Sequence, residues 1–584
     1  MSPAVRIMLA AFCAASVSTS VCAQKHDYYM TLGYSSTPVT NIFGGTDIDF
    51  NYWPPDTSYV FRAMDFTFNA AAICDEDGKL LFYTNGCTIN GANHLPITGG
   101  DSLNPGLLHD VFCDDGYRAE QGSTFVPHPG NDNLYYLIHL GLNYYDSIGG
   151  VGDKLYYTLI DKSLGNGYGA VIEKNQIILE DTLAFGLITL CRHANGRDWW
   201  IVVPEMSTPK NLIFLLTPYG IWGPYEQSIG NIQFDDDGTG NAVFSPDGTK
   251  YARFDWYNQL DYYDFDRCSG LFSNPKHLSI IEPADTFPNI GGVAFSSNSR
   301  YLYVTKADKV FQFDTWVDDL QSSKQTVAVY DGGVILQAAT GFFLPQLGPD
   351  GRIYICSSSA VPIMHLIEWP DRPGVLSNVI QRGFPLPTYN AWAMCFFPNF
   401  RLGPEDGSAC DTLGRDNLPL ANFRWDAEDT LHPSAFTFTD LSSYQPENWL
   451  WDFGDGNMST DTCPVHTYTS AGMYKVCLTV SNQYGIDSLC RTIIMGVIDA
   501  DEPAEDDMVI SLFPNPFSGS VYITLKPEQK FIASMYDTCG RLISQRTFDG
   551  QSVQWNLPQD LPLGIYFVRI QTFDGKIWLL KAMR

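Results

Sequence analysis

Residues 241–255 read NAVFSPDGTKYARFD, a pattern that recurs along most of the N-terminal two thirds of the chain. A run of small and apolar residues leads into Ser-Pro-Asp-Gly, and an aromatic run with alternating character follows. Pro, Asp and Gly favour a tight turn, and a period of two predicts β-strands on both sides of it. The stretch therefore predicts an antiparallel hairpin.

The same pattern occurs five more times, with turns that are mostly about fifty residues apart. A further strand and polar turn follow each copy, as in KVFQFDTWVDD at residues 309–319. A repeat of this length with roughly four strands is typical of a β-propeller blade. The other copies are residues 70–86, 123–140, 187–205, 293–306 and 343–359, and the six turns are centred near 77, 131, 196, 248, 299 and 351.

The number of blades depends on the two ends of this region. Residues 27–68 and 384–401 together supply about one more unit, with strands from both ends. A ring that closes by pairing its first and last strands leaves no open sheet edge. We therefore expect an all-β chain whose residues 24–405 form a seven-bladed β-propeller, with six blades as the alternative.

The first 23 residues have the features of a secretory signal. A single positive charge at Arg6 precedes the apolar run IMLAAFCAASV, and Val21-Cys22-Ala23 forms a cleavage site of small residues. We expect cleavage between Ala23 and Gln24; lipidation of Cys22 is the less favoured alternative. Elsewhere no stretch approaches the ~18 apolar residues of a membrane-spanning helix. An exported chain without a transmembrane span is therefore predicted.

Composition restricts the possible partners. The chain has 584 residues and a formal net charge of −30, and residues 508–584 are net basic, so the negative charge lies in the body. Such a body repels phosphates, which argues against nucleic acid and anionic lipid as partners. Solubility at a cell surface is the simplest reason for the charge.

Residues 421–496 contain WDFGDG at 451–456, then His466 and Tyr468, then the alternating strand Tyr474, Val476, Leu478 and Val480. This segment resembles the PKD domain, an Ig-like sandwich, and we expect it to span residues 415–498. The resemblance implies a spacer or contact module. Asp452 and Asp455 lack the spacing of a calcium loop and are expected to cap a turn. His466 is expected to be packed or hydrogen-bonded.

One disulfide candidate lies in this module. The hairpin YKVCLTVSNQYGIDSLCRTII turns at Gln483 and Tyr484, which places Cys477 opposite Cys490. Directly opposed residues of an antiparallel pair can be about 4.5 Å apart between Cα atoms, a tight but feasible distance for a bridge. The pattern is equally consistent with two free thiols on the sheet face.

The C-terminal segment, residues 508–584, consists of short alternating strands bounded by Pro, Gly or Asn, such as SLFPNPFSGSVYITL and LPLGIYFVRI. It is expected to form a small β-sandwich of about seven strands. It resembles the type A C-terminal sorting domain of the type IX secretion system of Bacteroidota, on Pro514, Asn515, Pro516, Asp537, Gly540, Arg541, Gly564, Ile565, Tyr566 and Lys581. The acidic run DADEPAEDD at 499–507 is predicted to be a solvated linker.

This combination of repeats, PKD module and sorting segment resembles large exported Bacteroidota proteins with WD-like propellers. The resemblance implies secretion or display on the outer cell surface, with the type IX machinery as partner of the C-terminal domain. It also implies removal of the sorting domain after export.

Few residues of the predicted propeller point to chemistry. The chain has no GxSxG, HExxH, P-loop or GxGxxG unit. Asp235, Asp236 and Asp237 are weak metal candidates, for calcium, but a solvated turn is the favoured interpretation. His193 is expected to cap a turn. Trp199 and Trp200 point to opposite faces of a strand, so one should pack in the core while the other could stack on a sugar.

We therefore interpret the sequence as a binding or adhesion protein with an extracellular glycan or protein ligand and no cofactor, calcium excepted. The alternative is an extracellular enzyme that acts on polysaccharide or peptide, with its site on the axial face of the propeller. The absence of a nucleophile or metal motif favours the first interpretation, although propeller enzymes can spread such residues over several blades.

Overall fold

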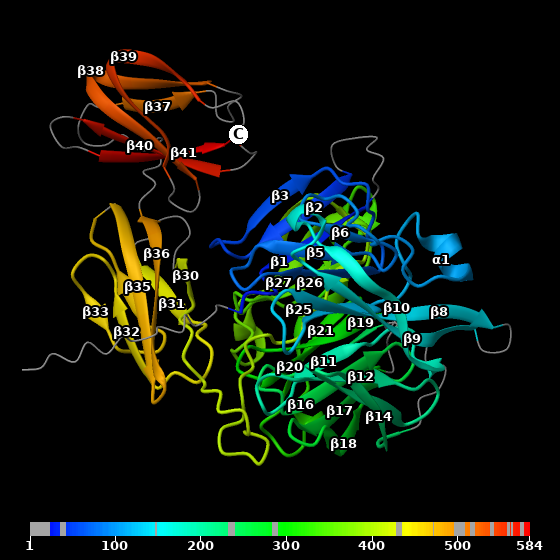
Figure 1. Ribbon diagram of the computed structural model, residues 1–584. Helices are drawn as coiled ribbons and strands as arrows, with labels where there is room; N and C mark the ends of the chain where they lie inside the picture. The colour runs from blue at the N-terminus through cyan, green and yellow to red at the C-terminus, as the bar shows by residue number, and fades with distance from the viewer. Residues whose placement is uncertain are drawn as a thin grey trace, which may run out of the picture.

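The computed structural model describes residues 24–34, 43–145, 149–231, 240–282, 290–427, 435–470, 472–495, 509–513, 520–537, 542–557, 561, 565–572 and 577–583. The fold is nearly all β. Among these residues there is one α-helix, α1 (Leu107–Phe112), and there are three 3-10 turns (Gly165–Gly167, Gln321–Ser323 and Gly374–Ser377). Figure 1 shows a large N-terminal region in blue to green, a smaller body in yellow and a C-terminal sheet in orange and red.

The N-terminal region, residues 24–401, is divided into small, mainly antiparallel sheets whose strands mostly follow chain order. Its described residues form one sheet of three strands, six of four and a two-stranded hairpin. The three-stranded sheet contains β1 (Tyr29–Tyr34), β2 (Gly44–Asp49) and β3 (Asp56–Val60), and the hairpin contains β23 (Val334–Ile335) and β24 (Ala338–Ala339).

The four-stranded sheets have the following strands. The first contains β29 (Met394–Cys395), β4 (Asn69–Cys74), β5 (Leu80–Thr84) and β6 (Ile89–Gly91). The second and third contain β7 (Ser123–Pro127), β8 (Leu134–Tyr145), β9 (Gly149–Asp161) and β10 (Ala170–Leu183), then β11 (Thr189–Arg192), β12 (Trp199–Pro204), β13 (Lys210–Thr217) and β14 (Gly220–Ser228).

The fourth to sixth four-stranded sheets continue the series toward the C-terminal end of the region. They contain β15 (Gly240–Phe244), β16 (Lys250–Asp255), β17 (Gln259–Asp266) and β18 (Leu271–Leu278); β19 (Gly291–Phe295), β20 (Tyr301–Lys306), β21 (Lys309–Asp314) and β22 (Gln325–Val329); and β25 (Phe342–Leu347), β26 (Ile353–Ser357), β27 (Val361–Ile367) and β28 (Val379–Asn390).

Each of the six predicted hairpin turns lies between two paired strands of a four-stranded sheet: β4 and β5, β7 and β8, β11 and β12, β15 and β16, β19 and β20, and β25 and β26. The Ser-Pro-Asp-Gly turn shows why these residues stand there. Asp247 accepts hydrogen bonds from the backbone N–H and hydroxyl of Thr249, both at 2.9 Å. Gly248 has a φ of +73°, which side-chain-bearing residues rarely adopt.

Neighbouring sheets are tied together by side-chain amides that imitate strand pairing. Gln121 donates to the carbonyl of Ala242 at 2.7 Å and accepts from its N–H at 2.8 Å. Asn241 makes the same double contact with the backbone of Val293, at 2.9 and 2.7 Å. All four residues are buried, so each amide satisfies backbone groups that would otherwise lose a partner.

The two ends of the N-terminal region meet. Strand β29 pairs with β4 and contacts β1 and β25, although about 325 positions separate it from β4 along the chain. Nearby, the hydroxyl of Thr388 lies 2.7 Å from that of Thr46 and donates to the carbonyl of Gly44 at 3.1 Å. The terminal segments therefore combine in one place, as expected from the sequence.

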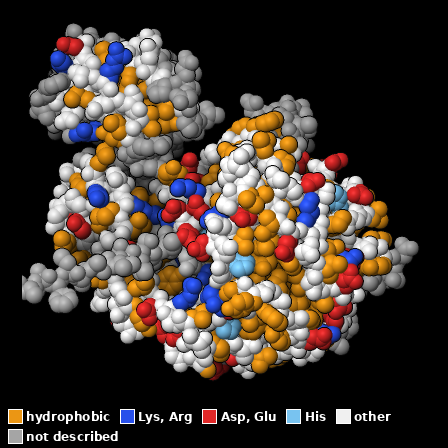
Figure 2. Space-filling view, viewed as in Figure 1, with side chains coloured by type: hydrophobic (Ala, Val, Ile, Leu, Met, Phe, Trp, Pro, Cys, Tyr) orange, Lys and Arg blue, Asp and Glu red, His pale blue; other side chains and the backbone are white. Residues whose placement is uncertain are grey.

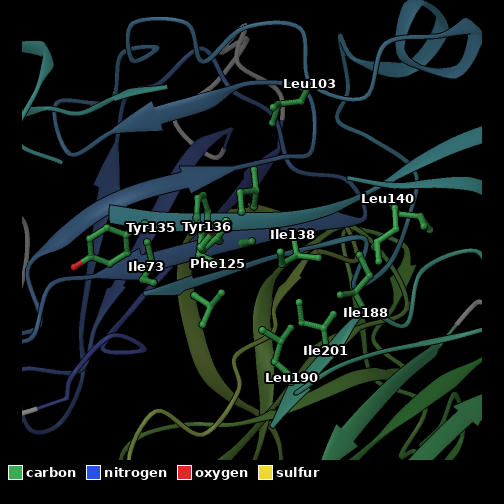
Figure 3. Close-up of a cluster of buried hydrophobic side chains, with 14 of the residues drawn as sticks. Ile73, Leu103, Phe125, Tyr135, Tyr136, Ile138, Leu140, Ile188, Leu190 and Ile201 are labelled. Carbon is green, nitrogen blue, oxygen red and sulfur yellow. The ribbon is translucent and has the colours of Figure 1, made fainter. Parts of the chain in front are cut away.

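The largest core cluster runs through three successive sheets. Figure 3 shows Ile73 of β4, Phe125 of β7, Ile138 of β8 and Leu190 of β11 among its members. Their side chains are at most 2% exposed. Burial of one such side chain contributes roughly 1.5–3 kcal/mol, so packing between sheets holds the region together.

The yellow body of Figure 1 is an Ig-like sandwich of two sheets. One contains β30 (Phe423–Ala427), β31 (Ala435–Asp440) and β34 (Val465–Thr467); the other contains β33 (Met458–Ser459), β32 (Asn448–Asp452), β35 (Gly472–Asn482) and β36 (Gly485–Met495). Trp451 and Val476 are fully buried in its core, and Phe453 is 2% exposed there. The alternating pattern of the sequence thus faces the core as predicted.

The described strands of the C-terminal segment are joined in one hydrogen-bonded sheet. It contains β37 (Val509–Phe513), β38 (Ser520–Asp537), β39 (Leu542–Asn556), β40 (Ile565–Thr572) and β41 (Ile577–Met583), five strands among the described residues. β37 pairs with the first part of β38 and β40 with its second part, across an irregularity between Thr524 and Gln529. The long strand β38 is shared by both parts of this sheet, and the sandwich of about seven strands stays a prediction.

Candidate functional site

A cavity of about 350 Å³ lies where the N-terminal region meets the Ig-like domain. Its walls come from β7, β11, β15, β19 and β25, from the turns that follow the last three of these strands, and from residues 396–402. Residues 440–443 of the Ig-like domain also line it. A volume of this size is at the lower end of the range for small-molecule sites in proteins.

Small side chains leave this space open. Ala242 of β15 and Ala294 of β19 line the cavity from the middle of their strands, where the other repeats also carry small or apolar residues. Polar side chains line the remaining wall, among them Thr124, Ser297 and Ser443. The cavity thus combines apolar walls with a few hydrogen-bonding groups, as small-molecule sites usually do.

Two arginines line the cavity in different electrostatic settings. Arg401 forms a two-pronged ion pair with Asp27, with both N–O distances at 2.6 Å, and this carboxylate helps raise the pKa of Arg401 despite its burial. Arg192 has no carboxylate partner among the described residues. Burial lowers the pKa of Arg192 to about 10, and the charges of Arg415 and Arg267 act in the same direction.

The guanidinium of Arg192 is held by neutral groups. It donates to the carbonyls of Gly196 and Phe400 and to the side-chain oxygen of Gln24, at 3.0 to 3.2 Å, and it lies 4.4 Å from the ring centre of Trp199. These contacts fix its position, and no described residue supplies a counter-ion for its positive charge.

Two carboxylates line the cavity without an ion pair within the described part of the chain: Asp371 and Asp440. Asp371 accepts hydrogen bonds from the hydroxyl of Ser297 at 2.5 Å and the backbone N–H of Asn298 at 3.0 Å. Asp440 accepts from the indole N–H of Trp449 at 2.8 Å and the N–H of Ser442 at 3.0 Å. Burial raises the pKa of Asp440.

The Ig-like domain is docked on the N-terminal region through a buried charged network. Arg424 of β30 donates to the carbonyls of Asp350 and Glu368, at 3.1 and 2.7 Å. Asp426 pairs with Arg424 at 3.2 Å and also with Arg352 of the N-terminal region. Figure 2 shows Lys and Arg side chains among Asp and Glu along this boundary.

Aromatic rings enclose the same network. The Trp53 indole donates to the carbonyl of Trp425 at 2.6 Å, and its ring centre lies 4.5 Å from the guanidinium of Arg352. Trp369 lies 4.7 Å from that of Arg424. The Ig-like domain, which was expected to be a spacer, is therefore docked on the N-terminal region in a fixed position. Its docking closes one side of the cavity.

Several predicted site residues lie outside the described residues: Ala23 of the cleavage site, Asp235, Asp236 and Asp237, Pro514, Asn515 and Pro516, and Gly564. Gln24 is described and contacts Arg192. Tyr566 is 4% exposed in the core of the C-terminal sheet, and the backbone of Lys581 lies in β41. The calcium hypothesis for the three aspartates stays a prediction.

Cys477 and Cys490 lie opposite each other in the hairpin of β35 and β36, in the predicted register. The structure joins them by a disulfide with 4.0 Å between the Cα atoms. Asp452 and Asp455 accept from the N–H groups of Gly454 and Asn457, at 2.9 and 3.0 Å, as turn caps do.

The remaining histidine and tryptophan expectations concern packing. His466 stacks on Phe453 with ring centres 4.0 Å apart and contacts Asp455 at 2.8 Å. His193 accepts from the N–H of Asn195 at 3.0 Å and so caps its turn. The sugar-stacking alternative for Trp199 and Trp200 is wrong, because the two are 1% and 4% exposed. Neighbouring sheets and the linker at Phe400 cover both faces of β12.

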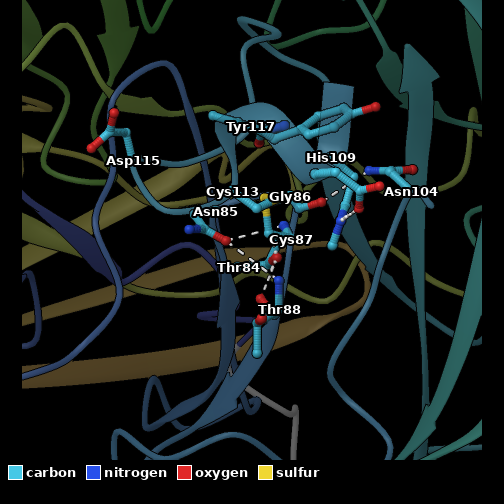
Figure 4. The surroundings of a disulfide bond; sticks show 12 residues. Thr84, Asn85, Gly86, Cys87, Thr88, Asn104, His109, Cys113, Asp115 and Tyr117 are labelled. Carbon is cyan, nitrogen blue, oxygen red and sulfur yellow. Dashed lines mark hydrogen bonds and ion pairs between the residues drawn. A yellow bond between two sulfur atoms is a disulfide. The ribbon is translucent and has the colours of Figure 1, made fainter. Parts of the chain in front are cut away.

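The sequence did not point to two further disulfides, Cys87–Cys113 and Cys268–Cys410. Figure 4 shows the first, next to Asn85 and Thr84, whose side chains hold the turn before Cys87. The second joins the β17–β18 turn to the segment that leads into the Ig-like domain. Both link residues distant in the chain, for which only the paired occurrence of cysteines in an exported protein is a signal.

No described helix has the length and hydropathy needed to cross a membrane. Over the same residues, no group of three or more His, Cys, Asp or Glu side chains is arranged to hold a metal ion.

Comparison with known proteins identifies two parts of the chain. Residues 419–497 match the family model of the PKD domain, and residues 511–579 match that of the secretion system C-terminal sorting domain. The chain carries both domains. The sorting domain indicates export to the cell surface or the medium and implies interaction with the secretion machinery.

Relatives share only short segments with this chain. A microbial collagenase of Vibrio alginolyticus is 32% identical over 81 residues, 13% of this chain and 10% of the relative. The pre-pro-metalloprotease PrtV of Vibrio cholerae is 29% identical over 140 residues, 24% of this chain and 13% of the relative. The chain thus spans only about a tenth of the length of these proteins.

Among solved structures, the PKD1 domain of the Vibrio cholerae metalloprotease PrtV is 33% identical, with a TM-score of 0.12. The alignment covers 13% of this chain and 95% of that domain.

Proposed function

We propose that this protein is a secreted or cell-surface binding protein whose N-terminal region is a seven-bladed β-propeller. The six four-stranded sheets, one of which includes β29 from the far end of the region, together with the three-stranded sheet of β1, β2 and β3 support seven blades over the alternative of six. A signal peptide at residues 1–23, a propeller at 24–405, a PKD domain at 415–498, an acidic linker at 499–507 and a sorting domain at 508–584 complete the proposal.

The observation that carries the proposal is the cavity that both domains line. The Ig-like domain contributes Asp440 and Ser442 to it and is held in place by Arg352, Arg424 and Asp426. A preformed cavity between two docked domains is a common location for a small-molecule or chain-end ligand. We infer that an extracellular glycan or peptide binds there and that the protein does not transform it.

A screen of the full chain against immobilised glycans and peptides tests this function. The matched variants are Ser443→Trp, which fills the cavity, and Thr412→Trp, which adds the same side chain at an exposed position. We expect a hit that the first variant loses at least tenfold and the second retains. A hit that both variants retain equally would place binding elsewhere.

The enzyme alternative is tested on the same hits. Each bound glycan or peptide is incubated with the protein, and its products are followed by mass spectrometry. We expect binding without turnover. Turnover that Ser443→Trp abolishes would replace the binding function by an enzymatic one at the same cavity.

A further inference from the structure

Not every charged side chain that lines the cavity has an oppositely charged partner there. Its lining contains two arginines, Arg192 and Arg401, and three aspartates, Asp27, Asp371 and Asp440. The pair of Arg401 and Asp27 is neutral as a unit, with two contacts at 2.6 Å. A single positive charge and two negative charges therefore remain without counter-ions among the described residues.

The positive side is the end of β11. Arg192 is 8% exposed and lines the cavity, and its Nε atom has no hydrogen-bond partner in the described structure. Arg267 donates to the backbone carbonyl of Arg192 at 2.9 Å, and its positive charge helps lower the pKa of Arg192. A buried cation without a partner is unfavourable, and a ligand anion in the cavity would relieve this.

The negative side is formed by the turn after β19, the loop after β27 and the Ig-like domain. Asp371 is fixed by Ser297 and Asn298, and Asp440 by Ser442 and Trp449. Both carboxylates belong to the lining of the same cavity. A ligand cation in the cavity would be stabilised by either carboxylate that it contacts.

We propose that the cavity binds a zwitterionic molecule of the amino-acid or short-peptide type, with its carboxylate toward Arg192 and its ammonium group toward Asp371 and Asp440. The proposal rests on the proposed binding function and names its ligand class. An anion without an ammonium group is repelled by the two aspartates, and a cation without a carboxylate leaves Arg192 unpaired.

Titration calorimetry on the full chain tests the proposal. The probes are glycine, diglycine and triglycine, an N-acetylated dipeptide amide as the uncharged control, succinate as the anion and cadaverine as the cation. We expect saturable binding of at least one free zwitterion, and binding at least tenfold weaker for the capped, anionic and cationic probes, since hydrogen bonds to charged groups are strong.

Variants then assign the ends of the ligand. Asp371→Asn and Asp440→Asn are expected to weaken zwitterion binding about tenfold each, and the exposed control Asp318→Asn to leave it unchanged. Arg192→Gln should weaken it similarly and Arg192→Lys less, because Lys keeps the charge. Melting curves identify any variant that fails to fold, and the aspartate variants carry the test if Arg192→Gln does.

Three results would overturn the proposal. Equal binding of the capped dipeptide would show a neutral polar site, and binding of succinate or cadaverine alone would show a site for one charge. If no zwitterion binds while a hit from the screen still depends on position 443, the binding function stands and this ligand class falls. If no zwitterion binds and the screen also gives no hit that depends on position 443, the proposed binding function is wrong as well.

Discussion

At the scale of single residues, the polar groups buried between sheets impose order that apolar packing alone does not. His139 of β8 is fully buried and contacts the side chains of Asn104 at 2.6 Å and Thr158 at 2.9 Å. Its ring is therefore held neutral between two neutral partners. Burial lowers the pKa of His139 to about 3.

This histidine predicts acid sensitivity. In the unfolded chain His139 is protonated below about pH 6.5, whereas in the folded protein it stays neutral down to about pH 3. The free energy of unfolding therefore falls as the pH is lowered through this window. The slope is about 1.4 kcal/mol per pH unit. Between pH 7 and pH 5, His139→Gln should lose roughly 2 kcal/mol less unfolding free energy than the native protein.

Denaturant unfolding at the two pH values measures this difference, with the unfolding of the N-terminal region monitored by a spectroscopic signal. Parallel losses in the native protein and the variant would show that His139 does not set the acid response.

At the scale of elements, hairpins are local and their connections are not. The register of β35 and β36 follows from a two-residue turn, which is why Cys477 and Cys490 could be paired on paper. The Cys268–Cys410 bridge spans 142 residues and depends on how β17 and β18 approach the segment after residue 401. No local pattern contains that information.

Loop length predicts the relative effect of these bridges. A cross-link stabilises by restricting the unfolded chain, by about 3 kcal/mol for a short loop and about 5 kcal/mol for one longer than a hundred residues. Replacing Cys268 and Cys410 by Ser should therefore lower the unfolding free energy more than replacing Cys477 and Cys490, whose separation is 13.

The midpoint of denaturant unfolding measures both pairs, and Cys463→Ser, at an exposed free thiol, serves as control with little expected change. A larger loss for the short loop than for the long one would mean that native packing, rather than chain restriction, dominates.

At the scale of the whole molecule, the docking of the Ig-like domain decides the shape of the cavity. Arg352 and Arg424 share Asp426, and all three are at most 12% exposed in their side chains. Breaking a buried ion pair from one side leaves an uncompensated charge, which destabilises by about 3–5 kcal/mol.

Asp426→Ala should therefore release the Ig-like domain from the N-terminal region while both stay folded. Small-angle scattering should show a larger maximum dimension, and protease should cut the segment between residues 402 and 420 faster. Asp461→Ala, at an exposed position of the same domain, is the control and should change neither. Unchanged scattering for Asp426→Ala would contradict a docking role for this network.

Much of the fold could be predicted because its signals are local. Turn residues such as Asp247 and Gly248 and the period of two in the strands determine six hairpins, and Trp451 and Phe453 reveal the inward face of the Ig-like domain. The C-terminal segment identified an exported protein. These features need only a few neighbouring residues, so the sequence by itself determined the elements, the PKD and sorting domains and the location.

The candidate site could not be predicted, because its residues come from positions as distant as Asp27, Arg192, Asp371 and Asp440. The residues next to each of them in the sequence form no motif that points to binding. Asp440, moreover, belongs to a domain that was expected to be a spacer. These charges meet in one cavity because neighbouring sheets pack together and the Ig-like domain docks on them. Both kinds of contact join segments that are far apart in the chain. Local sequence patterns thus indicate what the parts are and that the protein is exported, whereas packing between distant segments forms the cavity that we propose as the binding site.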